Sequence, residues 1–366
     1  MEEKLFRNRV AWMMFLLSIL VIWVHSYNVE LFAGKAPGVS FDQAAGLETF
    51  LSVTVGQIAV PGFFLLSSYQ FFRGFAWDQL AGKWKRRFFS IAVPYAAWNL
   101  LYYLGYVIAT RLPAVRAVVG KAPVPFSAGE MVRAVLDYAY APVFWYLYQL
   151  ILLIFLSPAI YLLMKRRILG LAVLAAMLAA IYFHLDTGRP NMDALFYYSF
   201  AAYMALHFRD AAESGPGTLG RSRGAGFGLG AAGGLLAAYC LFRALTPGAD
   251  VLWTVCGRLL APVSLWILLG AVSLPESRPW MRQSLFLYAV HFVIVRFVNK
   301  GAALAVGRLI PAGLAGIAAI LVFLLLPAFT AAVSYGMALA LNRWAPSVWR
   351  VLSGEALEGR IKGGWI

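Results

Sequence analysis

The sequence predicts an all-α fold: a polytopic integral membrane helix bundle with about ten transmembrane helices and both termini in the cytoplasm. Of the 366 residues, 62% are hydrophobic and only 13% are charged, whereas a soluble domain carries about 25% charged residues. Too few polar side chains are present to cover a water-facing surface, so lipid must solvate much of it. Apolar stretches recur evenly along the chain, which indicates one transmembrane domain over residues 1–366.

Each predicted helix is an apolar stretch close to the length that crosses a bilayer, about 20 residues. The stretches 168–184 and 192–208 are near the short limit for a span, and 225–245 is rich in Gly and Ala, which suits close helix packing. No small-residue cleavage site follows the first stretch, so we expect a retained helix and not a cleaved signal peptide. In chain order the predicted spans are 10–27, 49–72, 88–108, 143–164, 168–184, 192–208, 225–245, 251–272, 284–303 and 311–341.

The formal net charge of +15 has a topological explanation. With the N-terminus in the cytoplasm, twenty of the 31 Lys and Arg residues fall on the cytoplasmic side, nine fall outside and two fall within spans. This asymmetry follows the positive-inside rule, although the long 109–142 loop carries four of the outside residues. We therefore expect contacts with membrane lipids and none with nucleic acid. Cys240 and Cys256 both lie in apolar surroundings, which predicts neither a disulfide framework nor a zinc site.

The four histidines are candidates for acid–base chemistry. His184 and His207 lie at predicted helix ends, where an interfacial polar role is the better interpretation. His25 and His291 lie within or against apolar spans, where an ionisable group usually faces a bundle interior or a water-filled cavity. Each of these two could serve catalysis or could join two helices by a hydrogen bond. A neutral His25, near the outer end of the first helix, could take a proton from an attacking hydroxyl. His291, nearer the cytoplasmic half, is the alternative base.

Arg258 and Arg296 are the two charges placed most clearly inside predicted spans. We expect both to face a shared polar cavity, because an arginine at the bilayer centre costs at least about 2.5 kcal/mol. There they could bind an anion or a thioester oxygen; alternatively they pair with backbone carbonyls in a packed core. The basic run 83–87 precedes an apolar helix on the cytoplasmic side. This run could set the membrane topology and contact anionic lipid. Alternatively, it could dock a phosphate-bearing donor.

Five segments carry a family resemblance in their order along the chain. They are VHSYN (24–28), PGFFLLSSY (61–69), KWKRR running into VPYAAWN (83–87 and 93–99), FWYLY leading to LSP (144–148 and 156–158), and LFLYAVH (285–291). Each motif is weak alone, but together they resemble the acyltransferase family 3 of bacterial membrane proteins over about residues 5–300. The resemblance implies a single acyltransferase-like domain in a multi-pass protein of the bacterial plasma membrane.

The resemblance also implies transfer of an acyl group, often acetyl, from cytoplasmic acyl-CoA to a hydroxyl of an extracytoplasmic glycan or lipid-linked acceptor. Acetyl-CoA is the expected co-substrate, with no permanently bound cofactor and no metal. The family's catalytic first-helix histidine corresponds to His25. Its basic residues after the second helix correspond to Arg73, Arg86 and Arg87, which we expect to contact the donor. The sequence leaves a homodimer open.

This chain departs from the family pattern at three places. Many members carry an arginine eleven positions before the first-helix histidine, where this chain has Met14, and the nearest upstream arginine is Arg9. The glycine of the family's SGY segment is Ser68, and Tyr148–Gln149 stands where related sequences often have Arg-Asp. Two alternatives therefore remain open: a non-enzymatic transporter of a lipid-linked sugar, and a ligand-binding sensor on the same scaffold.

Overall fold

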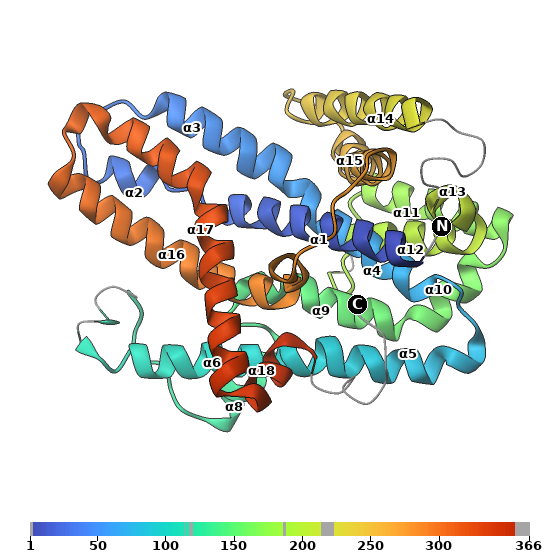
Figure 1. Cartoon of the computed structure of the whole chain (residues 1–366), viewed down its shortest axis with the longest axis horizontal. Coiled ribbons are helices and arrows are strands. Elements are labelled where there is room, and N and C mark those ends of the chain that lie inside the picture. The colour runs from blue at the N-terminus through green and yellow to red at the C-terminus, as the bar shows by residue number, and fades with distance from the viewer. Residues whose placement is uncertain (1–2, 114, 117–119, 186–187, 214–222, 356–366) are drawn as a thin grey trace. The chain divides into compact units, whose positions relative to one another are not determined.

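The computed structural model describes residues 3–113, 115–116, 120–185, 188–213 and 223–355, and it is helical throughout, with no strand among these residues (Figure 1). Each of the ten predicted apolar stretches coincides with helix in the structure. The chain divides into two compact units. The first contains Met1–Phe75 and Pro158–Gly336, and the second contains Ala76–Ser157 and Met337–Ile366.

In the first unit, helix α1 (Glu3–His25) packs against three long helices. These are α4 (Ala59–Phe72), α15 (Val251–Ala271) and α16 (Ser284–Leu309). Close approach of these helices depends on a small residue in α4: a Cβ added at Gly62 would lie 2.8 Å from Leu17 and 3.3 Å from Pro262. The remaining elements are α2 (Val29–Ala33), α3 (Asp42–Thr49), α10 (Ser157–Met164), α11 (Arg167–Tyr182), α12 (Met192–His207), α13 (Arg209–Glu213), α14 (Arg223–Ala244) and most of α17 (Ala315–Trp344).

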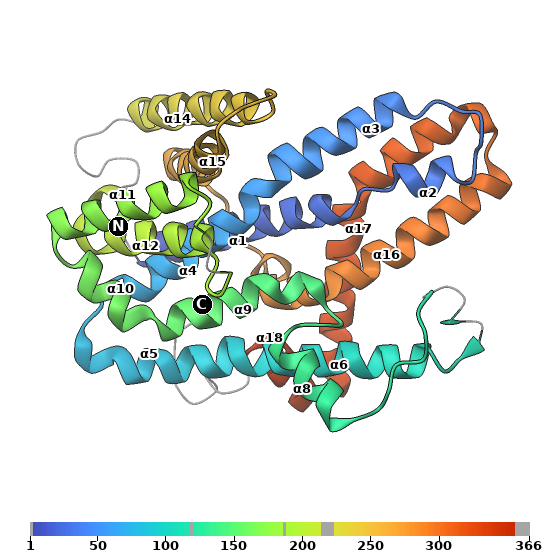
Figure 2. The ribbon, with the colours of Figure 1, turned by 180° about the vertical axis from the view of Figure 1, so that it is seen from behind.

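Helices α14 and α15 lie side by side (Figures 1 and 2). Their contact uses glycines on both helices, since a Cβ at Gly230 would come within 2.8 Å of Leu268, and one at Gly257 within 2.8 Å of Leu241. The close packing expected from the Gly-rich stretch 225–245 is therefore confirmed. Cys240 of α14 is buried and Cys256 of α15 is half-buried, and both are free thiols.

In the second unit, helix α6 (Val93–Ala109) packs against α8 (Ala128–Leu136) and α18 (Pro346–Ser353). Two tryptophans tie the helices of this unit together. The indole of Trp98 donates to the carbonyl of Leu352 (3.0 Å). The indole of Trp84, in α5 (Leu80–Arg87), donates to the carbonyl of Ile154 at 2.9 Å, in α9 (Trp145–Phe155). The same indole lies 3.1 Å from the hydroxyl oxygen of Ser157, so the third and fourth segments of the family resemblance contact one another.

Seven helical stretches of the described residues are long and apolar enough to cross a membrane, or eight if the bent pair Pro142–Phe155 and Ser157–Met164 is one span. This pair is bent by 63°. Helices α11 and α12 have 16 residues each, so the two stretches near the short limit fall below the length of a span. The structure is thus an all-α bundle with several spans, while the count of ten and the orientation of the termini remain predictions. The seven are Glu3–Ala33, Asp42–Phe72, Trp77–Ala109, Arg223–Ala244, Val251–Ala271, Ser284–Leu309 and Ala312–Trp344.

Candidate functional site

His25 is the last residue of α1, and the turn that follows it is held by two other elements. One oxygen of Glu48, in α3, accepts the backbone N–H groups of Asn28 (2.8 Å) and of the next residue (3.3 Å). The amide of Asn299, in α16, donates to the carbonyl of Ser26 (3.0 Å). Polar groups freed where a helix ends inside a protein need such partners, so these contacts fix where α1 stops and where His25 lies.

The imidazole of His25 lies against that of His291, with ring centroids 5.2 Å apart. The ring of Phe292 meets His25 edge-on at 5.4 Å. His291 is fully buried in α16, whereas His25 is half-buried. The sequence marked both histidines as candidates, which stays a prediction, but it placed them at different depths. That separation is wrong, because the two rings belong to one site.

His25 also lies deeper in the bundle than the sequence indicated. Helix α16 continues for 18 residues beyond His291, which is about 27 Å of helix. Next to this continuation, a second apolar core of α2, α3, α16 and α17 includes Phe32, Phe41 and Ala303. Figures 1 and 2 both show these four helices extending past the end of α1. The end of α1 is therefore not the end of the bundle. For this reason the position of His25 at the end of the first predicted helix did not indicate its depth.

Several buried polar atoms around this site have no hydrogen-bond partner among the residues that the structure describes. They are Nε2 of His291, Oε1 of Glu48, Oδ1 of Asn28, Oδ1 of Asn299 and Nε1 of Trp23. A buried polar group left unpaired is costly, so such groups usually bind water, an ion or a ligand. Their concentration around one turn gives this region the capacity to bind a molecule that carries hydroxyl groups.

The hydrogen bond of His291 indicates its tautomer. Its Nδ1 lies 2.5 Å from the carbonyl oxygen of Tyr288. A carbonyl can only accept, so Nδ1 carries the proton and Nε2 presents its lone pair. The site therefore contains a proton acceptor beside His25. Two adjacent neutral imidazoles are suited to receiving and passing on the proton of an alcohol.

Arg258 and Arg296 contact different residues in the structure. The guanidinium of Arg296 is exposed and lies 5.0 Å from the ring of Phe292, close enough to His25 to interact with it electrostatically. Arg258 is half-buried in α15 and interacts with Tyr197 of α12. The contacts that the structure gives these two arginines have no residue in common, and the expectation that they face a shared cavity stays a prediction. Arg296 adjoins the histidine pair and Arg258 does not.

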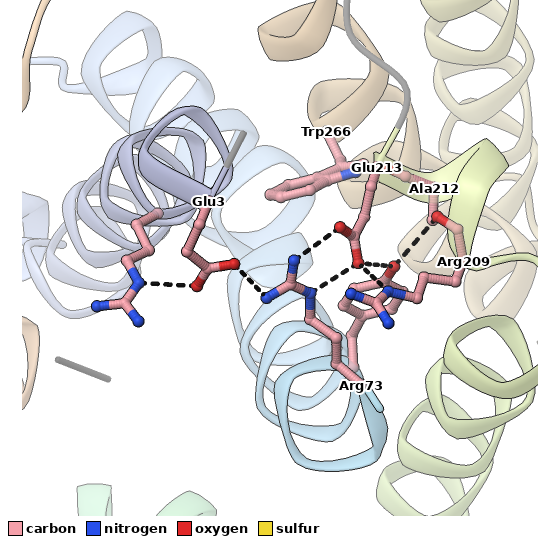
Figure 3. Close-up of polar contacts among 8 residues, drawn as sticks. Glu3, Arg73, Arg209, Ala212, Glu213 and Trp266 are labelled. Atoms are coloured by element: carbon pink, nitrogen blue, oxygen red, sulfur yellow. Dashed lines mark hydrogen bonds and ion pairs between the residues drawn. The ribbon is translucent and has the colours of Figure 1, made fainter. Parts of the chain in front are cut away.

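Arg73 forms an ion-pair network at the other end of α1 (Figure 3). Its Nε and Nη2 donate to the two carboxylate oxygens of Glu213 at 2.7 and 2.8 Å, and its Nη1 donates to Glu3 at 2.8 Å. Arg209 and the hydroxyl of Tyr69 also donate to Glu213, at 3.0 and 3.1 Å. A donor phosphate would have to displace carboxylates to reach Arg73. These contacts assign it a structural role.

Electrostatics reinforce this network. The hydrogen bonds to Glu213 hold the pKa of Arg73 above its ordinary value. Burial alone would raise the pKa of Glu213, but the hydrogen bonds from Arg73, Arg209 and Tyr69, together with the charge of Arg73, outweigh burial and hold that pKa below its usual value. Both shifts favour the ionised forms of Arg73 and Glu213, so the pair remains charged over the ordinary range of pH.

Arg86 and Arg87 belong to the second unit, at the end of α5. Arg86 is exposed and Arg87 is half-buried. The stacking of Trp84 on Phe155, with ring centroids 5.8 Å apart, fixes this helix against α9. A short π-helix, Phe88–Ala92, follows directly, and such irregular turns are frequent at functional sites. The basic run is thus rigidly supported, and its role as a donor contact stays a prediction.

The three departures from the family pattern have clear structural counterparts. Met14 projects only about 20° away from His25 around α1, whereas Arg9 projects about 160° away. Arg9 therefore does not lie on the face of α1 where the family's arginine would stand. The hydroxyl of Ser68, the glycine substitute, donates to the carbonyl of Tyr198 and links α4 to α12.

In α9, Gln149 is buried and the Tyr148 ring packs against Tyr138, with centroids 5.6 Å apart. The charged pair of related sequences is thus replaced here by packed, uncharged side chains. His207, one of the two histidines assigned to helix ends, donates from Nε2 to the carbonyl of Met164 (2.8 Å). Among the described residues, no three His, Cys, Asp or Glu side chains gather as they would around a metal ion.

Two residues of the first unit were missed in the sequence. Glu48 lies just before the predicted span 49–72, and an acidic residue next to an apolar run could have drawn attention to it. Arg9 is only 5% exposed and lies over the ring of Trp266, 3.9 Å from its centroid, with its Nε donating to the Trp266 carbonyl at 2.9 Å. Nothing in the sequence indicated that Arg9 is buried, because it belongs to an ordinary basic N-terminal segment.

The apolar helices and the buried polar site define a multi-pass, all-α membrane protein. Residues 8–339 match the family described as Acyltransferase domain, so the chain belongs to acyltransferase family 3. This match covers segments of both units and confirms the resemblance of the five motifs. No curated protein and no solved structure matches the chain.

Proposed function

We propose that this protein is a membrane O-acyltransferase of the bacterial plasma membrane. It moves an acyl group, acetyl in the first instance, from cytoplasmic acyl-CoA to a hydroxyl of an extracytoplasmic or lipid-linked glycan. Membership of the acyltransferase family supports the reaction class. The observation that carries the proposal is the contact between His25 and His291, a pair of imidazoles inside an apolar bundle.

In this proposal His25 is the general base. The acceptor hydroxyl attacks the thioester carbonyl and gives its proton to His25, and collapse of the tetrahedral intermediate breaks the C–S bond. Coenzyme A leaves as its thiol, taking the proton from His25, so the imidazole is neutral again. His291, fixed by Tyr288, would present its Nε2 lone pair to this centre and orient His25. Arg296 is close enough to stabilise the negative charge that develops on the carbonyl oxygen.

The buried polar atoms support an acceptor that carries several hydroxyl groups. The unpartnered oxygens of Glu48, Asn28 and Asn299 are acceptors that a polyhydroxylated molecule could satisfy. Arg86 and Arg87 are the proposed contacts for the phosphates of acyl-CoA, since guanidinium groups form strong charge-assisted hydrogen bonds with phosphate. We place Arg73 and Arg258 outside the donor site, because their neighbours are carboxylates and a tyrosine.

A ligand-binding sensor on the same scaffold is the second candidate. The observation that favours it is Met14, which stands on the face of α1 where many relatives have an arginine. Without that charge the site could still bind a hydroxylated ligand but would be less suited to holding a thioester. A sensor would bind ligand without consuming acyl-CoA, so turnover separates the two functions.

Turnover by the purified full chain tests the proposal. The protein in mild detergent is given radiolabelled acetyl-CoA with an extract of lipid-linked glycans, and both released coenzyme A and labelled lipid are measured. We expect release and transfer to depend on His25, tested as His25→Ala, and to survive His184→Asn. His184 is exposed and has a φ of 55°, which asparagine tolerates, so it is a matched control. Absence of thioester consumption with acetyl and longer acyl donors would contradict the proposal.

A further inference from the structure

A cavity of about 290 Å³ lies within the first unit, away from the histidine pair. It is lined by residues of α1, α4, α12, α13, α14 and α15. The walls are mostly apolar, with Met13, Leu65 and Phe200 among them. Its volume is near the lower end of the range for small-molecule sites. A cavity of this size and lining is suited to an aliphatic chain.

Both charged residues of the cavity lining are arginines. Arg9 is buried and packs on Trp266, whereas Arg223 is exposed at the start of α14. Tyr69 also lines the cavity and connects it to Glu213 through its hydroxyl. The chemistry is therefore that of an amphiphile: an apolar chamber with positive charge at one end. An anionic headgroup complements these charges, and a neutral or cationic one does not.

The cavity is separate from the proposed reaction centre. Arg9 and His25 are sixteen residues apart on one continuous helix, which places them about 24 Å apart along its axis and about 160° apart around it. A thioester whose acyl chain filled the cavity would lie on the wrong face of α1 for His25. The occupant is therefore not the donor.

The position of α14 indicates where the occupant comes from. Most residues of this helix are exposed, although it is one of the apolar spans, so its outer face contacts lipid. Arg223, Gly226 and Leu229 of the same helix line the cavity. A bilayer lipid beside α14 could thus place its headgroup at Arg223 and one acyl chain between α14 and α4.

We propose that the cavity binds one acyl chain of an anionic membrane phospholipid, whose phosphate contacts Arg223 and Arg9. The lipid fills the space between the α14–α15 pair and the α1, α4 and α12 helices, and it thereby stabilises the first unit. This site is independent of the acyl-transfer proposal, because it requires no turnover.

A pair of glycines in α14 provides the test. A Cβ at Gly226 would lie 3.5 Å from Ala271, an ordinary contact at the cavity wall, whereas a Cβ at Gly228 has nothing within 4 Å. Gly226→Leu therefore fills the cavity, and Gly228→Leu adds the same side chain outside it. Melting temperatures of the purified full chain are measured in detergent with added phosphatidylglycerol or with phosphatidylcholine.

We expect phosphatidylglycerol at about 100 times its Kd to raise the wild-type Tm by about 5 °C, and phosphatidylcholine to raise it much less. Gly228→Leu should keep this response, and Gly226→Leu should lose it. Arg223→Gln, an exposed substitution, should lose the preference for the anionic lipid. Equal responses to both lipids, or equal behaviour of the two leucine variants, would overturn the proposal. Stabilisation by palmitoyl-CoA that phosphatidylglycerol cannot compete away would also overturn it, because it would make the cavity a donor site.

Discussion

The two ends of α1 carry polar clusters of opposite character. Near the N-terminus, Glu3, Arg73 and Glu213 form ion pairs in which the hydrogen-bonding groups of Arg73 are engaged by carboxylates. At the other end, His25 adjoins a fully buried His291 whose Nε2 has no partner among the described residues. A satisfied network stabilises the positions of helices, whereas an unsatisfied one has groups left to bind a ligand. The comparison favours a structural role for the first end, and it supports the proposal that the second end carries the chemistry.

Loss of His25 should have the largest effect. His25→Ala removes the proposed base, and a positioned imidazole typically contributes about 10²–10⁴ in rate. We expect kcat to fall by this factor at matched membrane levels, as measured by acyl transfer. Because the two rings are adjacent, the double variant with His291→Ala should be no worse than His25→Ala alone. Near-normal kcat in His25→Ala together with an inactive His291→Ala would reverse the assignment of the base.

Loss of the basic run of α5 should have the second-largest effect, and this effect should fall on the binding of the acyl donor. Replacing Arg86 and Arg87 by Gln should raise the KM for acyl-CoA by about tenfold or more, since a hydrogen bond to a charged group is worth about 1.5–3 kcal/mol. The KM for the acceptor should change much less. Arg73→Gln is the comparison variant, and it should lower stability without a selective effect on the donor. Equal changes in both KM values would indicate that the basic run serves membrane topology and does not bind the donor.

Breaking the ion-pair network should lower stability and spare turnover. Glu213→Gln removes an ionised acceptor of three donors, and we expect the free energy of unfolding to fall by about 2 kcal/mol. The measurement is thermal unfolding of purified protein, with kcat expressed per folded molecule. Glu276→Gln is the control, because Glu276 forms a 3.6 Å pair with Lys4 in which both side chains are largely exposed. A fall in kcat per folded molecule in Glu213→Gln would contradict the contrast between the two ends.

The smallest expected effect is the pH dependence of the same network. The pKa of Glu213 is lowered in the folded protein from an ordinary value of 4.5. Its stabilising contribution is therefore complete above about pH 4.5 and is lost as the pH falls through the lowered pKa. Melting temperatures of wild type and Glu213→Gln should converge as the pH is taken below 4.5. Curves that stay parallel would show that Glu213 does not titrate in this way.

The sequence predicted the helices well because each apolar stretch reports directly on its own burial in lipid. The stretch 251–272 became α15 (Val251–Ala271), and 192–208 became α12 (Met192–His207). What it could not give was the bend of 63° within 143–164. Length and hydropathy do not distinguish a straight span from a broken one.

The candidate site was only partly predictable for a related reason. His25 and His291 were recognisable because an ionisable group in an apolar stretch is unusual, whatever its partner. Their contact spans 266 positions of sequence, and the pairing of Arg73 with Glu213 spans 140. No local spacing encodes such contacts, so the sequence did not indicate that Arg73 pairs with a carboxylate. Pairings of this kind follow from helix packing, which a single sequence does not specify.

The orientation of Arg9 and His25 on opposite faces of α1 has a consequence for a cell that remodels its membrane. If the cavity binds lipid as proposed, a change in the supply of anionic lipid would act at the Arg9 face and would change how many copies of the protein survive quality control. It would not alter the rate at which each surviving copy works. Lipid composition would then set the abundance of the protein in the membrane, and substrate supply would set the output of each molecule.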